Sequence, residues 1–113
     1  MNAKDTVLAY LDALNHENFT TARKLISDDF VFRGVMGNRD GGDDYMKDME
    51  KMKMKYRVSK VFTDGNDISV AYDIDMSGKR IFSMGWYHVA DGKIDHFKVL
   101  FDPRPLLEES NKN

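Results

Sequence analysis

The sequence contains no cysteine, and this absence excludes a disulfide scaffold, a thiolate nucleophile and a zinc–thiolate cluster. It also lacks an excess of one charge. Its 17 basic and 19 acidic side chains give a net charge of −2 and are mixed along the chain. Since no basic stripe is available to bind a phosphate backbone and release its counterions, we expect no nucleic-acid partner. The unbroken apolar run of a signal peptide or a membrane span is missing as well, so we expect a cytoplasmic protein with no membrane partner.

What the sequence does contain is enough apolar material for one core. Hydrophobic residues make up 42% of the chain and aromatic residues 12%. With 113 residues, this composition predicts a single domain over residues 1–113.

Helical periodicity is concentrated in the first half of the chain. Asn2 is the predicted N-cap of a first helix, and Asn18 is the predicted N-cap of a second, short helix that includes Ile26 and ends at residues 27–29. A loop rich in glycine and aspartate, residues 37–44, leads into a third helix. The apolar positions of the first helix are Val7, Tyr10, Leu11 and Leu14, and those of the third are Tyr45, Met49 and Met52.

The rest of the chain has the composition of strands separated by turns. The predicted strands cover residues 30–33, 57–63, 68–76, 80–89 and 94–101. Because helices come first and an antiparallel meander follows, the pattern predicts an α+β fold in which three N-terminal helices pack on one face of a curved, mostly antiparallel sheet.

The last predicted hairpin assigns residues to the two faces of the sheet. Ala90-Asp91-Gly92 suits a three-residue loop, which places Val89 opposite Lys93. One face then carries Gly85, Tyr87, Val89, Phe97, Val99 and Phe101, and the other carries Met84, Trp86, His88, Ile94, His96, Lys98 and Leu100. Since three helices cover only one face, we expect a homodimer through the other, by way of Trp86, His88, His96, Lys98 and Leu100. Gly85 either leaves open space for a pocket or permits a bend or bulge.

Four segments, taken in order and spacing, carry a family resemblance. Residues 7–15, 27–32, 91–94 and 100–103 together resemble the SnoaL-like branch of the nuclear transport factor 2-like superfamily. The resemblance implies a cone-shaped fold with a pocket between helices and sheet. It implies less about activity, because this fold hosts isomerases, cyclases, hydrolases, dehydratases and binding domains without catalysis.

Comparison with the enzymes of that superfamily leaves one candidate catalytic residue. Tyr10 matches the tyrosine that polarises the substrate oxygen in ketosteroid isomerases, but the base position falls on Gly34 and the acid position falls on Gly85 or Met84. The inward positions of the last strand that carry catalytic groups in the cyclase- and hydrolase-like relatives correspond here to Phe97 and Val99, whose side chains cannot donate or accept a proton. The acid and base residues of the known enzymes are therefore largely absent.

These observations predict a pocket that binds a small, largely apolar molecule without a cofactor. Tyr10 would contact the ligand together with Phe32, Gly34, Tyr72, Gly85, Tyr87, Phe97, Val99 and Phe101. One alternative is an isomerase- or cyclase-like enzyme in which Tyr10 polarises a carbonyl and water or another carboxylate moves the proton. The other is a dimeric interaction module without a ligand, in which the phenylalanines fill the cavity.

Two of the three histidines are candidate metal ligands. His88 and His96 lie diagonally on one face in the predicted register, but two ligands do not complete a site, and packing at an interface is the favoured interpretation. We therefore expect no metal site. Asp73 and Asp75, which alternate with apolar residues in one strand, remain minor candidates for an acid or a base.

Overall fold

The computed structural model describes residues 1–110. Within these residues the chain forms four helices and six strands. In chain order they are α1 (Ala3–Asn15), α2 (Phe19–Lys24), β1 (Ile26–Arg33), β2 (Asn38–Asp40), α3 (Gly42–Met52), β3 (Lys55–Asp64), β4 (Asp67–Met76), β5 (Lys79–Ala90), β6 (Lys93–Phe101) and α4 (Arg104–Ser110).

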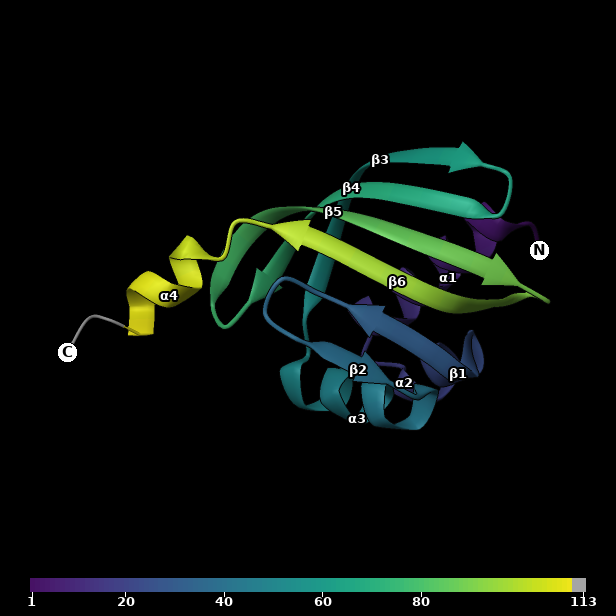
Figure 1. Cartoon of the computed structure of the whole chain (residues 1–113), viewed down its shortest axis with the longest axis horizontal. Helices are drawn as coiled ribbons and strands as arrows, with labels where there is room; N and C mark the ends of the chain where they lie inside the picture. Colours follow the sequence, from purple (N-terminus) through teal and green to yellow (C-terminus); the bar gives the residue numbers. More distant parts are fainter. Residues whose placement is uncertain (111–113) are drawn as a thin grey trace.

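The described strands form one curved, open sheet in the order β2-β1-β6-β5-β4-β3. Every neighbouring pair is antiparallel except β1 and β6, which run parallel. Helix α1 packs on β3 to β6, and α3 packs on β1 and β2, so α1 to α3 cover what we call the inner face, whereas α4 extends beyond the end of the sheet (Figure 1). The predicted α+β architecture is confirmed.

The helix starts follow the capping signals in the sequence. The Asn2 side chain accepts a hydrogen bond from the Asp5 amide at 2.8 Å, and the Asn18 side chain accepts one from the Thr21 amide at 3.3 Å. These bonds satisfy amide groups that a helix leaves free in its first turn. The predicted stripe of α1 is buried against the sheet.

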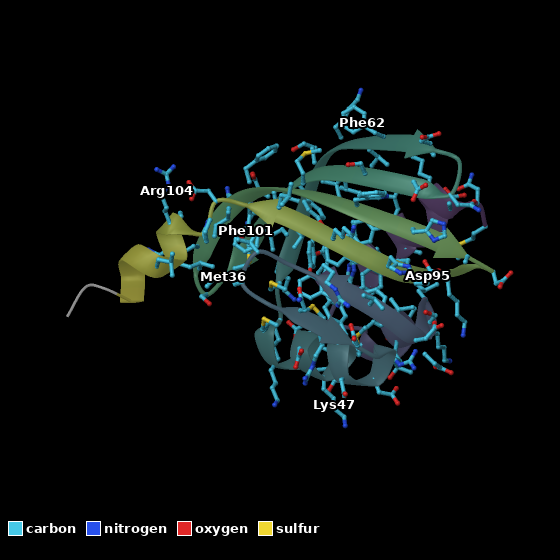
Figure 2. All side chains as sticks on the ribbon, viewed as in Figure 1. Met36, Lys47, Phe62, Asp95, Phe101 and Arg104 are labelled. Carbon is cyan, nitrogen blue, oxygen red and sulfur yellow. The ribbon has the colours of Figure 1, made fainter. Side chains whose placement is uncertain are left out.

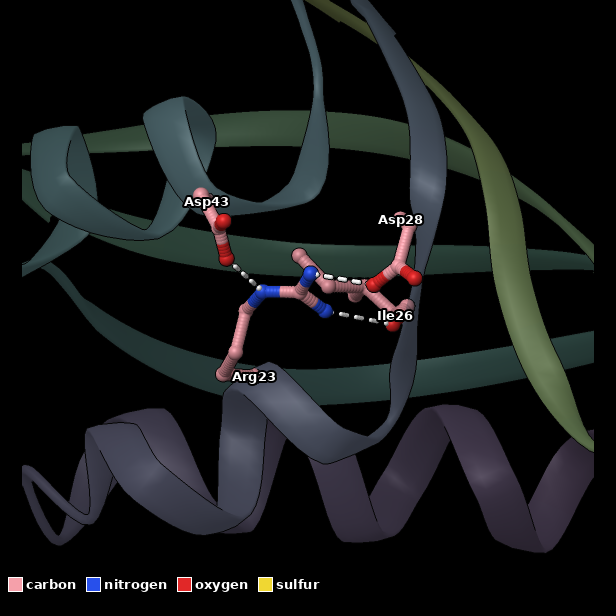
Figure 3. Close-up of polar contacts among 4 residues, drawn as sticks. All are labelled: Arg23, Ile26, Asp28 and Asp43. Atoms are coloured by element: carbon pink, nitrogen blue, oxygen red, sulfur yellow. Dashed lines mark hydrogen bonds and ion pairs between the residues drawn. The ribbon is translucent and has the colours of Figure 1, made fainter.

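One arginine connects three elements at the helical end of the molecule. Arg23 of α2 donates from Nε to Asp43 of α3 at 2.7 Å, and from its terminal nitrogens to Asp28 at 2.6 Å and to the Ile26 carbonyl at 3.0 Å in β1 (Figure 3). The planar guanidinium can serve all three acceptors at once because its donors point in fixed, diverging directions.

Three element boundaries differ from the sequence prediction. Ile26 belongs to β1 and not to α2, because it pairs with Ile94 of β6 in the parallel part of the sheet. Strand β2 replaces part of the predicted loop, and its three exposed residues are ordered by backbone pairing with β1 and not by apolar alternation. Helix α4 follows Pro103, where no helix was predicted.

The β5–β6 hairpin also differs from the predicted register. Asp91 and Gly92 have φ values of 52° and 76°, which suits a two-residue turn of type I′, and Ala90 pairs with Lys93. A β-bulge then leaves Asp95 without a partner, so that His88 lies directly opposite His96. Ile94 consequently packs in the core, and its predicted position on the outer face is wrong. The bulge adds one residue to β6, so the residues from His96 onward point to the faces that the sequence predicted.

Candidate ligand-binding cavity

A cavity of about 610 Å³ lies between the inner face of the sheet and α3. Its mouth is formed by the connection between β1 and β2 and by the end of α3, where Met36 and Met52 are more than half exposed. Met36 and Phe101 both line the cavity, at the end of the molecule where α4 lies (Figure 2). Leu106 of α4 also lines the cavity.

Aromatic rings form one wall of the cavity. The Phe32 ring lies 5.1 Å from the Tyr45 ring and 5.4 Å from the Phe97 ring, and Phe97 stacks on Tyr87 at 4.2 Å between centroids. Such packing restricts ring movement, because each ring is held by neighbours on both sides. This part of the lining is therefore closely packed, with the Phe32 ring tilted by about 40° against its two neighbours.

Methionine side chains form a second part of the lining. Five of the eight methionines line the cavity. They are Met36, Met49, Met52, Met54 and Met76. Methionine has three rotatable bonds and a polarisable sulfur, so a wall of this kind can adapt its shape to an apolar ligand.

All five tyrosines of the chain are buried in the core. Burial raises the pKa of each of these hydroxyls, so they remain protonated and can donate hydrogen bonds at neutral pH. Tyr45 and Tyr56 line the cavity, and the Tyr56 hydroxyl contacts the Met49 sulfur at 3.8 Å. These two phenols are neutral hydrogen-bond donors among the side chains that line the cavity.

The predicted ligand-contacting residues divide into two groups. Those that line the cavity are Phe32, Gly34, Phe97, Val99 and Phe101. Those that lie outside the lining are Tyr10, Tyr72, Gly85 and Tyr87. Contact of any of them with a ligand stays a prediction.

Gly85 does not leave open space. A side chain at this position would overlap the Tyr72 hydroxyl and lie 3.0 Å from the Phe97 ring. The room that glycine provides in the sheet is therefore used by two neighbouring side chains.

Tyr10 is also fully enclosed, and its hydroxyl has no hydrogen-bond partner of good geometry among the described residues, although Tyr45 lies near enough to influence its pKa.

An ion pair that the sequence did not predict lies at the cavity wall. Asp48 of α3 pairs with Arg39 of β2, with 3.0 Å between Oδ2 and Nε, and the Asp48 side chain is 29% exposed. Asp48 is the one carboxylate among the described residues that line the cavity. Only the local arrangement of β2 beside α3 brings the two residues together, and β2 itself was not predicted.

The outer face of the sheet has a separate group of polar side chains. One carboxylate oxygen of Asp95 lies 2.7 Å from Nδ1 of His88 and 3.2 Å from Nδ1 of His96. The sequence did not predict Asp95 as a neighbour of the two histidines, because only the bulge turns its side chain toward them. The minor acid–base candidate Asp75 is ion-paired on the same face with Arg57 at 3.4 Å and Arg80 at 3.6 Å.

Comparison with known proteins identifies the family. The profile of the SnoaL-like domain matches residues 7–97, and the chain belongs to this family. The crystal structure of a nuclear transport factor 2-like protein of unknown function from Cytophaga hutchinsonii is 50% identical over 95% of this chain and 96% of that one, with a TM-score of 0.93. The NTF2-like, cone-shaped fold that the sequence analysis expected is thereby confirmed.

A more distant structure shares the fold alone. An LEH-like epoxide hydrolase from M. tuberculosis is 23% identical over 94% of this chain and 86% of that one, with a TM-score of 0.81. A search of curated proteins found no match. Within residues 1–110, no helix is both long enough and apolar enough to span a membrane.

Proposed function

We propose that this SnoaL-like protein binds a small, largely apolar molecule in the cavity between the sheet and α3. The observation that carries the proposal is the cavity itself, whose volume of about 610 Å³ falls within the range of about 300–1,000 Å³ typical of ligand sites. Closely packed aromatic rings and adaptable methionine side chains together favour a hydrophobic ligand.

The two cavity tyrosines favour a ligand that also carries a hydrogen-bond acceptor. The hydroxyls of Tyr45 and Tyr56 stay protonated, and a bond that either donates to a carbonyl or hydroxyl oxygen would form away from water. Such a bond orients the ligand more strongly in an apolar site than it would in solvent. A hydrophobic compound with one carbonyl group fits this arrangement.

The predicted alternative of a dimeric interaction module without a ligand has less support. It requires that Phe32, Phe97 and Phe101 fill the cavity themselves. In the structure these three side chains are part of the lining of a volume of about 610 Å³. The rings leave room for another molecule.

An enzymatic function is the second candidate, and Asp48 is the observation that favours it. It supplies a carboxylate in the wall of a cavity that also contains two phenols, the combination that proton transfer next to a carbonyl needs. Because Tyr10 lies outside the lining, Tyr45 or Tyr56 would polarise the carbonyl in place of Tyr10, and Asp48 would be the carboxylate that moves the proton. Turnover of a bound compound, detected by mass spectrometry and lost in Asp48→Asn, would favour the enzyme, whereas release of unchanged compound would favour binding alone.

A thermal-shift screen tests binding. Compounds with an apolar ring system and one carbonyl should raise the melting temperature of the full chain, because a ligand that binds only the folded state stabilises it. Val99→Phe should reduce the shift, because Val99 lines the cavity. Leu100→Phe is the matched control, because the next residue of β6 is 72% exposed and points to the outer face. No shift across a broad panel, or equal loss in both variants, would contradict the proposal.

We also propose that two copies associate through the outer face. Trp86 is 51% exposed there, and the neighbouring strand positions expose Phe82, Met84 and Leu100. A solvent-exposed apolar surface of this kind, with an aromatic residue at its centre, is typical of the core of an interface.

Analytical ultracentrifugation tests the dimer. The unmodified chain should sediment as a dimer at micromolar concentration. Trp86→Lys should sediment as a monomer, since each substitution occurs twice in a symmetric interface. Met52→Lys is the matched control, because Met52 is 53% exposed but lies on α3. A monomeric unmodified protein would refute the assignment of this face.

A further inference from the structure

The outer face holds a second pocket, well apart from the ligand cavity. It is lined by Asp67, Trp86, His88, Asp95, His96 and Lys98. Asp95 lies at the opposite end of the sheet from Phe101 and Met36, which mark the cavity mouth (Figure 2). A ligand of this pocket would therefore contact none of the residues that line the cavity.

The β-bulge in β6 is what assembles the pocket. In a regular strand, neighbouring residues point to opposite faces of the sheet. Asp95 has no partner on β5, so Asp95 and His96 both reach the outer face, while Ile94 and Phe97 on either side of them are buried in the core. His88 of β5 lies directly opposite His96. Bulges commonly redirect a side chain at a functional site.

Three potential ligand atoms converge in this arrangement. The same oxygen of Asp95 faces Nδ1 of His88 at 2.7 Å and Nδ1 of His96 at 3.2 Å, and the ligand atoms of the three side chains all lie within 4.8 Å of one another. Around a tetrahedral zinc ion, with metal–ligand bonds of about 2.0–2.2 Å, neighbouring ligand atoms are about 3.3–3.5 Å apart. Small side-chain rotations are enough to reach that spacing.

From these observations we propose that His88, Asp95 and His96 form a binding site for one divalent transition-metal ion of the zinc type, with the remaining coordination position open to water. Two imidazoles and one carboxylate favour zinc, cobalt or nickel over magnesium and calcium, which prefer sites made of oxygen alone. For both rings to coordinate through Nδ1, the proton must be on Nε2, the tautomer in which Nδ1 offers its lone pair to the metal.

The surrounding charges support a cation. Asp67 adds a second carboxylate to the pocket, where it accepts a hydrogen bond from the Trp86 indole at 3.0 Å. The Lys98 ammonium lies over the Trp86 ring, 5.2 Å from its centroid. With neutral imidazoles, the pocket therefore carries more negative than positive charge.

Spectroscopic titration with cobalt tests the site. The full chain, freed of metal with a chelator and kept without an affinity tag, should bind one Co²⁺ per chain and develop visible absorption bands of tetrahedral cobalt, which added Zn²⁺ removes. Asp95→Asn and His96→Gln should each weaken binding at least tenfold, as loss of one of three ligands does. His16→Gln is the matched control, because His16 also lies beside a carboxylate, Asp12 at 3.4 Å, but has no second imidazole in that pair.

The unmodified protein provides a second measurement that does not depend on how the variants fold. Added Zn²⁺ should shift the side-chain nitrogen resonances of His88 and His96 in NMR spectra and leave those of His16 in place. Equal shifts on all three histidines would overturn the proposal. So would a stoichiometry of one ion per two chains, or affinities in Asp95→Asn and His96→Gln equal to that of the unmodified protein.

Discussion

The hydroxyl of Tyr72 and the hydroxyl of Tyr87 form a hydrogen bond of 2.6 Å inside the core, on neighbouring strands. Either oxygen can be the donor. The bond lets two buried polar groups satisfy each other, so both rings can pack in the apolar interior without the cost of an unpaired hydroxyl. Its geometry depends on Gly85, which leaves the room that the Tyr72 hydroxyl occupies.

Gly85→Ala is therefore expected to destabilise the protein. The new methyl group would overlap the Tyr72 hydroxyl and press on the Phe97 ring, and overpacking of this kind costs about 1–3 kcal/mol. The free energy of unfolding, measured with urea, reports the loss. In a Tyr72→Phe background the same substitution should cost about 1 kcal/mol less, because the overlapping oxygen is gone. Equal costs in both backgrounds would show that Tyr72 is not the obstacle.

Tyr10→Phe is expected to leave stability unchanged or to raise it by up to about 1 kcal/mol, because it removes a buried hydroxyl without a partner of good geometry. Tyr87→Phe is the matched control. It removes the partner of the Tyr72 hydroxyl and should cost about 1 kcal/mol or more. Urea unfolding of both variants checks the contrast, and a large loss in Tyr10→Phe would show that its hydroxyl has a structural partner.

Asp28 should titrate at unusually low pH. Its hydrogen bond with Arg23, and then the attraction of the same positive charge, lower the pKa of the Asp28 carboxyl. The folded state therefore favours the ionised form. This contribution to stability is complete at neutral pH and is lost as the pH falls through the lowered pKa of the folded state.

NMR titration of the side-chain carboxyl groups in Arg23→Gln checks this prediction. The pKa of Asp28 should rise toward the ordinary value of about 3.9 in that variant. Glu17 is the internal control, because the hydrogen bond that lowers its pKa comes from Lys55. An unchanged Asp28 titration in Arg23→Gln would show that the pair seen in Figure 3 does not persist in solution.

Gly92→Ala is expected to destabilise the β5–β6 hairpin by about 1 kcal/mol, because Gly92 has a φ of 76° in the turn and alanine is strained in that region. Gly37→Ala is the matched control. Its φ lies outside that region and an added methyl group would meet no atom within 4 Å, so its effect should stay within about 0.5 kcal/mol. Thermal unfolding of the two variants distinguishes them, and equal effects would argue against the turn geometry.

Local patterns in the sequence predict helices α1 to α3, most of the strands and most of the sheet faces. The caps at Asn2 and Asn18 and the spacing of apolar residues in α1 act within a few residues, so they are readable without the fold. Alternation along β5 and β6 placed Tyr87 and Phe97 on the inner face for the same reason. The family resemblance added the curved sheet and the expectation of a pocket.

Features that depend on pairing between distant segments become visible only in the folded chain. The bulge at Asp95, the parallel contact of β1 with β6 and the approach of Arg39 to Asp48 all arise when separate segments meet, and no local pattern encodes them. The space beside Gly85 likewise depends on which side chains pack into it, and Tyr72 occupies it. Local preferences determine which face a residue takes, whereas register and free volume are set by the packing of the whole chain.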